Sequence, residues 1–324
     1  MAEAETYKRA KNIYENLKKS MGKAIIGQEE VIEQILITIL TGNHALLEGY
    51  PGLGKTMMVR TLAQCMDLKF NRVQCTPDLM PSDITGTFVI EEEAKTKKKV
   101  FRFQQGPVFS NILLADEINR ATPKTQSALL ESMQEKQVTV GGQTFPLEPP
   151  FFVLATQNPI EMEGTYPLPE AQVDRFLLKL LVKYPKFDEE KRIVDIYASE
   201  KSPSVGKVVD KAKMLELGKL ARKMPISNDL RDYVLRIVSA TRPTEENKIA
   251  SQHLDYGASP RASIGIVLAS KARALLYGNN YVSKKDIEAV SLPVLRHRLI
   301  LNFESEREGL TTDEVVQSIL KEVK

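Results

Sequence analysis

The sequence is poor in the side chains that build covalent cross-links and metal centres. Among its 324 residues are two cysteines and three histidines. Cys65 and Cys75 form no CxxC pair and lie near no Cys/His cluster, so neither a disulfide framework nor a zinc site is indicated. His44, His253 and His297 are isolated in the sequence, and core or surface positions suit them better than metal ligation. We therefore expect a protein of a reducing interior.

Long apolar runs and an excess of charge of one sign are also missing. The first twenty residues, MAEAETYKRAKNIYENLKKS, are too charged for a signal peptide or a membrane span. The 45 basic and 42 acidic residues leave a formal charge of +3, so no strong overall field draws the chain toward nucleic acid or a membrane. With 42% hydrophobic residues the composition is that of a globular protein, which we expect to be cytoplasmic.

The hydrophobic pattern changes near residue 185 and divides the chain in two. Five short apolar runs are typical of strands, at 44–50, 70–75, 111–116, 151–156 and 176–182. Helical stretches lie between several of them, and this alternation indicates a parallel sheet covered on both faces. Beyond residue 185 the pattern is helical, at 187–201, 211–224, 227–242 and 259–278. We predict an α/β domain over residues 1–185 and a smaller helical domain over residues 186–324.

The stretch GYPGLGKT follows the first apolar run and precedes a helical one. Its spacing, a glycine, four residues and then Gly-Lys-Thr, is typical of the phosphate-binding loop of nucleoside triphosphatases, and the strand-loop-helix order speaks against a chance Gly-rich turn. Gly52 and Gly54 let backbone N–H groups approach phosphate oxygens. Lys55 would neutralise the β- and γ-phosphates of ATP, and the Thr56 hydroxyl would bind Mg²⁺. The predicted nucleotide-binding residues of the loop are Gly49, Tyr50, Pro51, Gly52, Leu53, Gly54, Lys55 and Thr56.

A second motif, NILLADEINRA, ends an apolar run with two carboxylates, Asp116 and Glu117. In an open α/β sheet the end of such a strand lies near the phosphate loop. Asp116 would then hold Mg²⁺, and Glu117 would act as the general base on the attacking water. An acidic pair that simply caps a helix is the alternative, but it is the poorer interpretation beside the first motif. The two motifs together predict hydrolysis of a nucleoside triphosphate.

Both motifs resemble those of the AAA+ ATPases, and the chain is similar to the MoxR family in particular. The similarity covers nearly the whole chain. Its most specific stretches are GYPGLGKT, LLADEINRATPKTQSALLESMQE, FFVLATQNPIEMEGTYPLPEAQVDRF and GASPRA. The resemblance implies an AAA+ α/β core, with a parallel sheet flanked by helices, and a smaller all-helical lid domain.

The resemblance also implies roles for residues outside the two motifs. Asn158 matches the sensor 1 position, where an amide orients the attacking water or senses the γ-phosphate. Arg175 matches the arginine finger, which in the family reaches the nucleotide of the neighbouring subunit. Arg261 matches sensor 2, a cation that the lid brings over the phosphates. Ile26 and Gly27 match the segment that contacts adenine.

Each of these roles has a plainer alternative. An Asn-Pro step commonly begins a turn, and the segment around residue 26 is also typical of a linker. Arg175 could pair on the surface with Asp174 or Glu170. Arg261 could be a solvated side chain in the first turn of a helix. One sequence alone leaves these alternatives open.

Two segments, residues 86–109 and 135–150, are predicted to form β-hairpins, the second turning at Gly141 and Gly142. In related rings such hairpins face the central pore or a partner. The alternative is that both segments are simply solvated loops, as charged segments usually are. The tip of the first hairpin is basic but follows three glutamates, and no aromatic residues interleave there, so nucleic acid is not expected to bind it. Its lysines are Lys95, Lys97, Lys98 and Lys99.

The resemblance implies a ring-forming ATPase, a homo-oligomer and by family likeness a hexamer, that remodels or matures a protein client. It also implies a partner protein with a von Willebrand factor A domain. The alternative is a nucleic-acid-dependent AAA+ translocase or helicase, which shares the hairpins and the nucleotide chemistry. Because the α/β core begins near the start of the sequence, we expect no separate nucleic-acid-binding domain, which favours a protein client. A third possibility, a nucleotide-gated scaffold without turnover, would not need Glu117.

Overall fold

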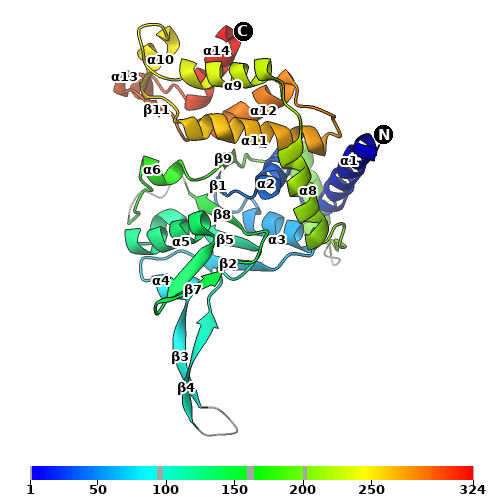
Figure 1. Ribbon diagram of the computed structural model, residues 1–324, viewed down its shortest axis with the longest axis vertical. Helices are drawn as coiled ribbons and strands as arrows, with labels where there is room; N and C mark the ends of the chain where they lie inside the picture. The colour runs from blue at the N-terminus through cyan, green and yellow to red at the C-terminus, as the bar shows by residue number, and fades with distance from the viewer. Residues whose placement is uncertain (1, 93–97, 159–163, 200–202, 324) are drawn as a thin grey trace.

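The computed structural model describes residues 2–92, 98–158, 164–199 and 203–323. Lys95 and Lys97, predicted at the tip of the first hairpin, lie outside these ranges. An α/β domain holds the central sheet, and helices dominate after residue 185 (Figure 1). The helical domain lies on one side of the α/β domain, and the first hairpin projects from the other side (Figure 1).

The central sheet has five strands in the order β2-β5-β8-β1-β9, and every neighbouring pair is parallel. These strands are β1 (Ala45–Glu48), β2 (Phe70–Gln74), β5 (Ile112–Asp116), β8 (Phe152–Gln157) and β9 (Leu178–Leu181). Both β5 and β8 lie inside the sheet and are buried along almost their whole length, which explains their unbroken apolar sequences. The carboxyl ends of all five strands share one edge, where open α/β sheets bind ligands.

Helices cover both faces of the sheet. Alternate residues of β5 point to opposite sides, so that Ile112 and Leu114 join one apolar cluster and Leu113 and Ala115 join another. The first cluster contains α1 (Ala2–Met21), α2 (Glu29–Thr41) and α3 (Lys55–Cys65), and the second contains α5 (Pro123–Glu135). Three short elements complete the domain: α4 (Pro81–Thr85), the 3-10 helix η1 (Ile118–Arg120) and α6 (Glu170–Val173).

The part of the chain beyond residue 185 is built mainly from helices. These are α7 (Phe187–Tyr197), α8 (Lys211–Lys223), α9 (Asn228–Ala240), α10 (Lys248–His253), α11 (Pro260–Leu276), α12 (Lys284–Leu295), α13 (Phe303–Arg307) and α14 (Thr312–Glu322). A short antiparallel pair, β10 (Leu254–Tyr256) and β11 (Ile300–Leu301), ties two loops of this domain together. Ser259 caps α11 and Pro260 occupies its first turn.

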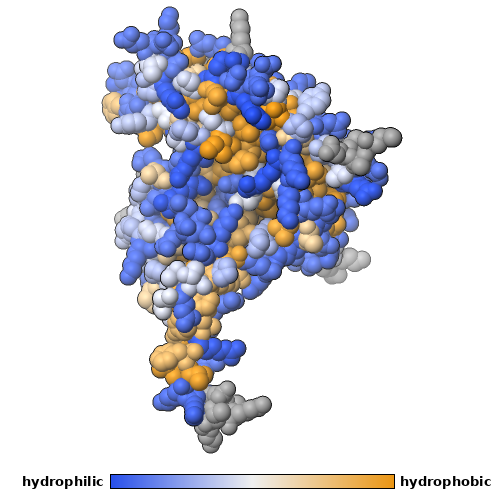
Figure 2. Space-filling view, viewed as in Figure 1, coloured by the Kyte–Doolittle hydropathy of each residue, from blue (hydrophilic) through white to orange (hydrophobic). Residues whose placement is uncertain are grey.

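Both predicted hairpins are present. The first pairs β3 (Gly86–Glu92) with β4 (Lys99–Gln105), and the second pairs β6 (Gln137–Val140) with β7 (Gln143–Pro146). Figure 2 shows apolar side chains gathered on the projecting first hairpin. Among them Ile90 and Phe101 face each other across the two strands and are well exposed.

The predicted fold, an α/β core with a parallel sheet flanked by helices and a smaller helical lid domain, is confirmed. The larger apolar cluster, however, continues from α1, α2 and α3 into α8, α9, α11, α12 and α14. The division of the chain near residue 185 therefore stays a prediction.

Candidate functional site

The phosphate-binding loop and the acidic pair meet at the carboxyl edge of the sheet. The register pairs Glu48, the last residue of β1, with Gln157, the last of β8. It also pairs Gln74, the last residue of β2, with Asp116, the last of β5. The loops that follow these four strand ends therefore lie close together, as predicted for the two motifs.

The backbone of the loop between β1 and α3 favours glycine at several points, two of which are Gly49 and Gly54. A Cβ atom on Gly49 would lie 2.9 Å from the Val182 Cβ atom, so the chain can pass the end of β9 there only without a side chain. Gly54, directly before α3, has a φ of 72°, in the left-handed region that favours glycine. The loop thus presents the N-terminus of α3, with its free N–H groups, to the edge of the sheet.

Lys55, the first residue of α3, reaches back over the loop. Its Nζ atom donates a hydrogen bond to the Gly49 carbonyl oxygen at 2.7 Å. Burial lowers the pKa of Lys55, and the nearby carboxylates of Asp116 and Glu117 partly offset this effect. An anion such as a phosphate would favour the charged ammonium group in the same way.

The Asp116 carboxylate is buried and held from two sides. The Thr156 hydroxyl donates to its Oδ1 atom at 2.6 Å. Arg72 of β2 donates to Oδ2 from Nε at 3.1 Å and from Nη2 at 2.7 Å. The guanidinium therefore neutralises a carboxylate that would otherwise be a buried, unpaired charge.

The neighbouring Glu117 has an unusual backbone, with a φ of 58°, which turns the chain sharply from β5 into η1. Its N–H group donates to the Thr156 hydroxyl at 2.8 Å. Its Oε2 atom accepts hydrogen bonds from the Gln74 amide at 2.8 Å and from Arg120 at 3.1 Å. The carboxylate is thus oriented by polar donors from the two flanking elements, β2 and η1.

Of these residues, Lys55, Arg72, Gln74, Asp116 and Glu117 line a single cleft of about 440 Å³, which also includes Asn158, directly after β8. The residues fit the phosphates of a nucleotide together with Mg²⁺, because the cleft offers helix N–H groups and an ammonium for the phosphates and a hydroxyl at Thr56 and two carboxylates for the metal ion. In the described ranges no three His, Cys, Asp or Glu side chains cluster. Mg²⁺ does not require such a cluster, because it is typically held by one or two carboxylates together with substrate phosphates.

A second, more apolar pocket of about 370 Å³ adjoins the phosphate cleft and shares the loop residues 51–54 with it. Ile26, Tyr184 and Tyr197 line it, a composition that suits a planar base. The Tyr197 hydroxyl donates to the Ala24 carbonyl oxygen at 2.7 Å and so ties α7 to the segment before α2. Gly27 turns the backbone beside this pocket, with a φ of 74°.

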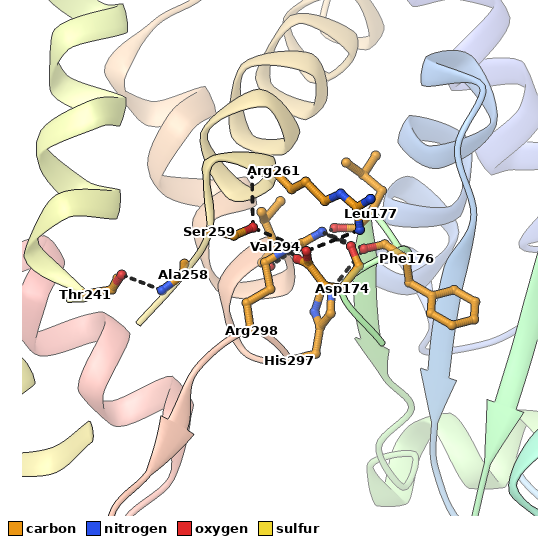
Figure 3. A network of polar contacts seen from close by, with 10 residues as sticks. All are labelled: Asp174, Phe176, Leu177, Thr241, Ala258, Ser259, Arg261, Val294, His297 and Arg298. Atoms are coloured by element: carbon orange, nitrogen blue, oxygen red, sulfur yellow. Dashed lines mark hydrogen bonds and ion pairs between the residues drawn. The ribbon is translucent and has the colours of Figure 1, made fainter. Parts of the chain in front are cut away.

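The structure does not bring Arg175 and Arg261 to the phosphate cleft. Both line a different cleft of about 310 Å³ between the α/β and helical domains, together with Lys136 and Arg222. Arg261 lies 3.5 Å from the Asp174 carboxylate (Figure 3). Arg175 is exposed, and within the described part of the chain its guanidinium has no ion-pair partner, Asp174 and Glu170 included. The surface pairing considered for Arg175 is therefore absent.

The residues that sequence reasoning missed are those that orient the carboxylates: Arg72, Gln74, Arg120 and Thr156. A signal for two of them was present. Arg72 and Gln74 are two residues apart in β2, so both side chains project from one face. Because parallel strands end at the same edge, polar residues late in β2 could have been expected to meet the acidic pair.

Comparison with known proteins agrees with this geometry. The profile of the ATPase family associated with various cellular activities (AAA) matches residues 44–178, and that of an AAA lid domain matches residues 246–319. The chain is 44% identical over 326 residues to Chaperone MoxR1 of Mycobacterium tuberculosis, covering 99% of this chain and 83% of that protein. It is 42% identical to the Bacillus subtilis protein YeaC, covering 96% of each.

A solved structure gives the same result. The crystal structure of a protein assigned as an ATPase from Cytophaga hutchinsonii has a TM-score of 0.92 and 44% identity, covering 99% of this chain and 97% of that chain. Within the described residues, no helix is both long and apolar enough to cross a membrane. The relatives do not favour the nucleic-acid-dependent alternative. The matches to both profiles, and to relatives along almost the entire chain, show that it belongs to the MoxR family of AAA+ ATPases.

Proposed function

We propose that this protein binds ATP with Mg²⁺ in the phosphate cleft, hydrolyses it, and uses the reaction in a chaperone-like remodelling of a protein client. One observation carries the proposal. Lys55, Thr56, Asp116, Glu117 and Asn158, taken from three separate stretches of the chain, line one cleft at the N-terminus of α3. The name of the Mycobacterium tuberculosis relative, Chaperone MoxR1, supports the chaperone-like role.

Each side chain then has a distinct task. Lys55 would exchange its bond to the loop carbonyl for the phosphates, and Thr56 and Asp116 would hold the metal ion. Mg²⁺, when bound, would neutralise charge on the β- and γ-phosphates. Glu117 would accept the proton of the attacking water, and the Asn158 amide would orient that water.

The proposed active site needs a second copy of the chain. Arg175 and Arg261 are exposed on a cleft of their own, so within one subunit they cannot stabilise charge in the phosphate cleft as the structure stands. In a ring, the arginine cleft of one subunit would face the phosphate cleft of the next. We therefore propose a ring, a hexamer by family resemblance, in which Arg175 is the arginine finger and Arg261 assists it from the same side.

The wider partners are also proposals from the family resemblance. A partner with a von Willebrand factor A domain would connect the ring to its protein client. The two hairpins are the elements best placed to meet either of them, because the first projects well beyond the rest of the chain (Figure 1).

A pair of substitutions tests the chemistry. Glu117→Gln is expected to retain binding of ATP and lower the hydrolysis rate about a hundredfold or more, because the general base is lost. Lys55→Ala is expected to weaken nucleotide binding itself, measured with a fluorescent ATP analogue. Glu131→Gln, on the exposed face of α5, is the matched control and should behave like wild type. Hydrolysis at the wild-type rate by Glu117→Gln would remove Glu117 from this role.

A further inference from the structure

One cationic side chain outside the phosphate cleft, that of Arg298, makes five hydrogen bonds. Arg298, in the turn between α12 and β11, has a side chain that is only 3% exposed. Its Nε atom donates to Asp174 Oδ1 at 2.8 Å, and its Nη atoms donate to the carbonyl oxygens of Phe176 at 2.6 Å and of Leu177 at 3.1 Å (Figure 3). It also donates to the carbonyl oxygens of Asp174 and Val294.

Three of those four carbonyl groups belong to the short turn that carries Arg175. This turn, residues 174–177, lies between α6 and β9, and none of the strands that the structure describes pairs with its carbonyl groups. Its far end is fixed to the sheet, because the Leu177 N–H group donates to the His44 carbonyl oxygen at 2.8 Å. Arg298 takes up the carbonyl groups on both sides of Arg175, and His297 Nε2 lies 3.0 Å from the Phe176 carbonyl oxygen, so the turn depends on side chains of the helical domain for its shape.

The same network reaches Arg261. The second carboxylate oxygen of Asp174 lies 3.5 Å from Arg261 Nη1 and accepts a hydrogen bond from the Ser259 hydroxyl at 3.3 Å (Figure 3). Asp174 thus has the buried Arg298 on its inner side and Arg261, which is 53% exposed, on its outer side. A carboxylate between two guanidinium groups fixes the spacing of both.

We propose that Arg298 is a positioning residue for the arginine finger, and that it makes Arg175, Asp174 and Arg261 one unit that moves with the helical domain. The inference rests on the proposed role of Arg175 in the neighbouring subunit. A planar guanidinium with five N–H donors can hold an ion pair and several carbonyl groups at once, whereas a lysine offers three donors from a single atom. When the helical domain shifts, the finger shifts with it, so the state of the helical domain in one subunit sets hydrolysis in the next.

The chain offers a matched control for this role. Arg296 lies two residues earlier, and its side chain is also largely buried, at 10% exposed. It pairs with Asp313 and donates to the Lys179 carbonyl oxygen in β9, but its side chain makes no hydrogen bond or ion pair with residues 174–177. Arg296→Met therefore removes a buried arginine from the same turn without touching the finger.

The test is complementation in mixed rings. Arg298→Met is expected to bind ATP like wild type and to lose about tenfold to a hundredfold in hydrolysis, because a misplaced catalytic group costs rate rather than binding. Lys55→Ala subunits lack a usable phosphate cleft but keep a positioned finger. Mixing the two should restore activity above the sum of the separate variants, as should mixing Lys55→Ala with Arg175→Ala. Arg298→Lys should fall between wild type and Arg298→Met.

The results distinguish failure of the positioning role from failure of the shared site, once native mass measurement has confirmed mixed rings. If Arg175→Ala is rescued and Arg298→Met is not, Arg298 is merely structural and the positioning role is wrong. If neither is rescued, the finger does not act between subunits, and both proposals fall. Should Arg298→Met not fold, Asp174→Asn, which keeps the side-chain shape but removes the charge shared by the two arginines, takes its place with the same expected rescue. Activity loss by Arg296→Met equal to that by Arg298→Met would also overturn the proposal.

Discussion

At the scale of single residues, His44 shows how a buried polar side chain can fix the start of a strand. It precedes β1 and is buried. Its Nδ1 atom accepts a hydrogen bond from the Val153 N–H group at 3.0 Å, and its Nε2 atom, 2.9 Å from the Met133 carbonyl oxygen, carries the proton. Only the neutral imidazole can make both bonds. Burial lowers the pKa of His44 to about 4.

This environment predicts a loss of stability in mild acid. In the unfolded chain a histidine takes up a proton near pH 6.5, whereas folded His44 does so only near pH 4, so the contribution is complete above pH 6.5 and falls as the pH drops toward 4. Between pH 7 and pH 5 the loss in free energy of unfolding is about 2 kcal/mol. Chemical unfolding of His44→Asn at both pH values should show a pH dependence smaller by that amount. An equal pH dependence in both proteins would contradict the prediction.

The candidate site was predictable where sequence spacing carries the chemistry. Lys55 and Thr56 follow from the glycine pattern, and Asp116 and Glu117 follow from the end of an apolar run. Arg298 could not be found in this way, because its contacts join residues more than 120 positions apart and its sequence neighbourhood holds two further basic residues, Arg296 and His297. Whether an arginine is a solvated side chain or a buried anchor is decided by tertiary packing, which no local pattern records.

At the scale of elements, an aromatic junction joins the two hairpins. Phe103 of β4 stacks on Phe145 of β7 with ring centroids 4.1 Å apart, and Phe88 of β3 lies 5.5 Å from Phe103. Phe109, which follows the first hairpin, packs edge-on against Phe103. The second hairpin therefore covers Phe88 and Phe103 at the base of the first hairpin. Ile90 and Phe101, farther out on the same face, are exposed.

Because of this junction, we predict that loss of an aromatic ring in the first hairpin also destabilises the second hairpin. Phe103→Ala removes the stacked pair, worth about 1 kcal/mol, and should raise amide hydrogen exchange of β6 and β7 about fivefold. Phe101 lies on the same face of the hairpin, but its side chain is 75% exposed and outside the junction. Phe101→Ala should therefore leave hydrogen exchange of β6 and β7 unchanged. Hydrogen exchange with mass spectrometry reads both variants. No difference between them would show that the junction does not stabilise the second hairpin.

The elements themselves were predicted to different degrees. The five sheet strands and both hairpins agree with the sequence pattern, because buried strands need apolar runs and tight turns need glycine. The pair β10 and β11 was missed, since three and two residues are too few to form a pattern. Helices α12 and α14 were not singled out, although both have Ser or Thr caps. Pro293 weakens the helical pattern of α12, whereas α14 is amphipathic and its pattern could have been recognised.

At the scale of the whole molecule, a charged network clamps the helical domain to the first two helices. Glu33 of α2 accepts hydrogen bonds from Arg273 of α11 and from the hydroxyl groups of Tyr14 and Tyr277. Arg273 also pairs at 2.6 Å with Asp286, whose side chain is 1% exposed. The network lies alongside the larger apolar cluster, which likewise spans both domains. The two domains should therefore unfold together.

Breaking this clamp tests that expectation. Arg273→Met leaves Asp286 and Glu33 without their cation, and removal of one partner from a buried pair costs about 3 kcal/mol. The midpoint of chemical unfolding should fall accordingly, still as a single transition when followed by fluorescence and by proteolysis. Arg9→Met breaks an exposed pair with Glu5 and should change the free energy of unfolding by about 0.5 kcal/mol or less. Early release of the helical domain alone would contradict a shared core.

The separation of the phosphate cleft from the arginine cleft has a consequence for how the enzyme behaves in dilute solution. If each catalytic unit is a junction between two chains, the specific activity cannot be a property of the single chain. On dilution below the assembly constant, subunits would keep their nucleotide yet turn it over slowly. The rate of ATP hydrolysis per chain would then depend on the concentration of the protein, and the isolated subunit would bind ATP but hydrolyse it slowly.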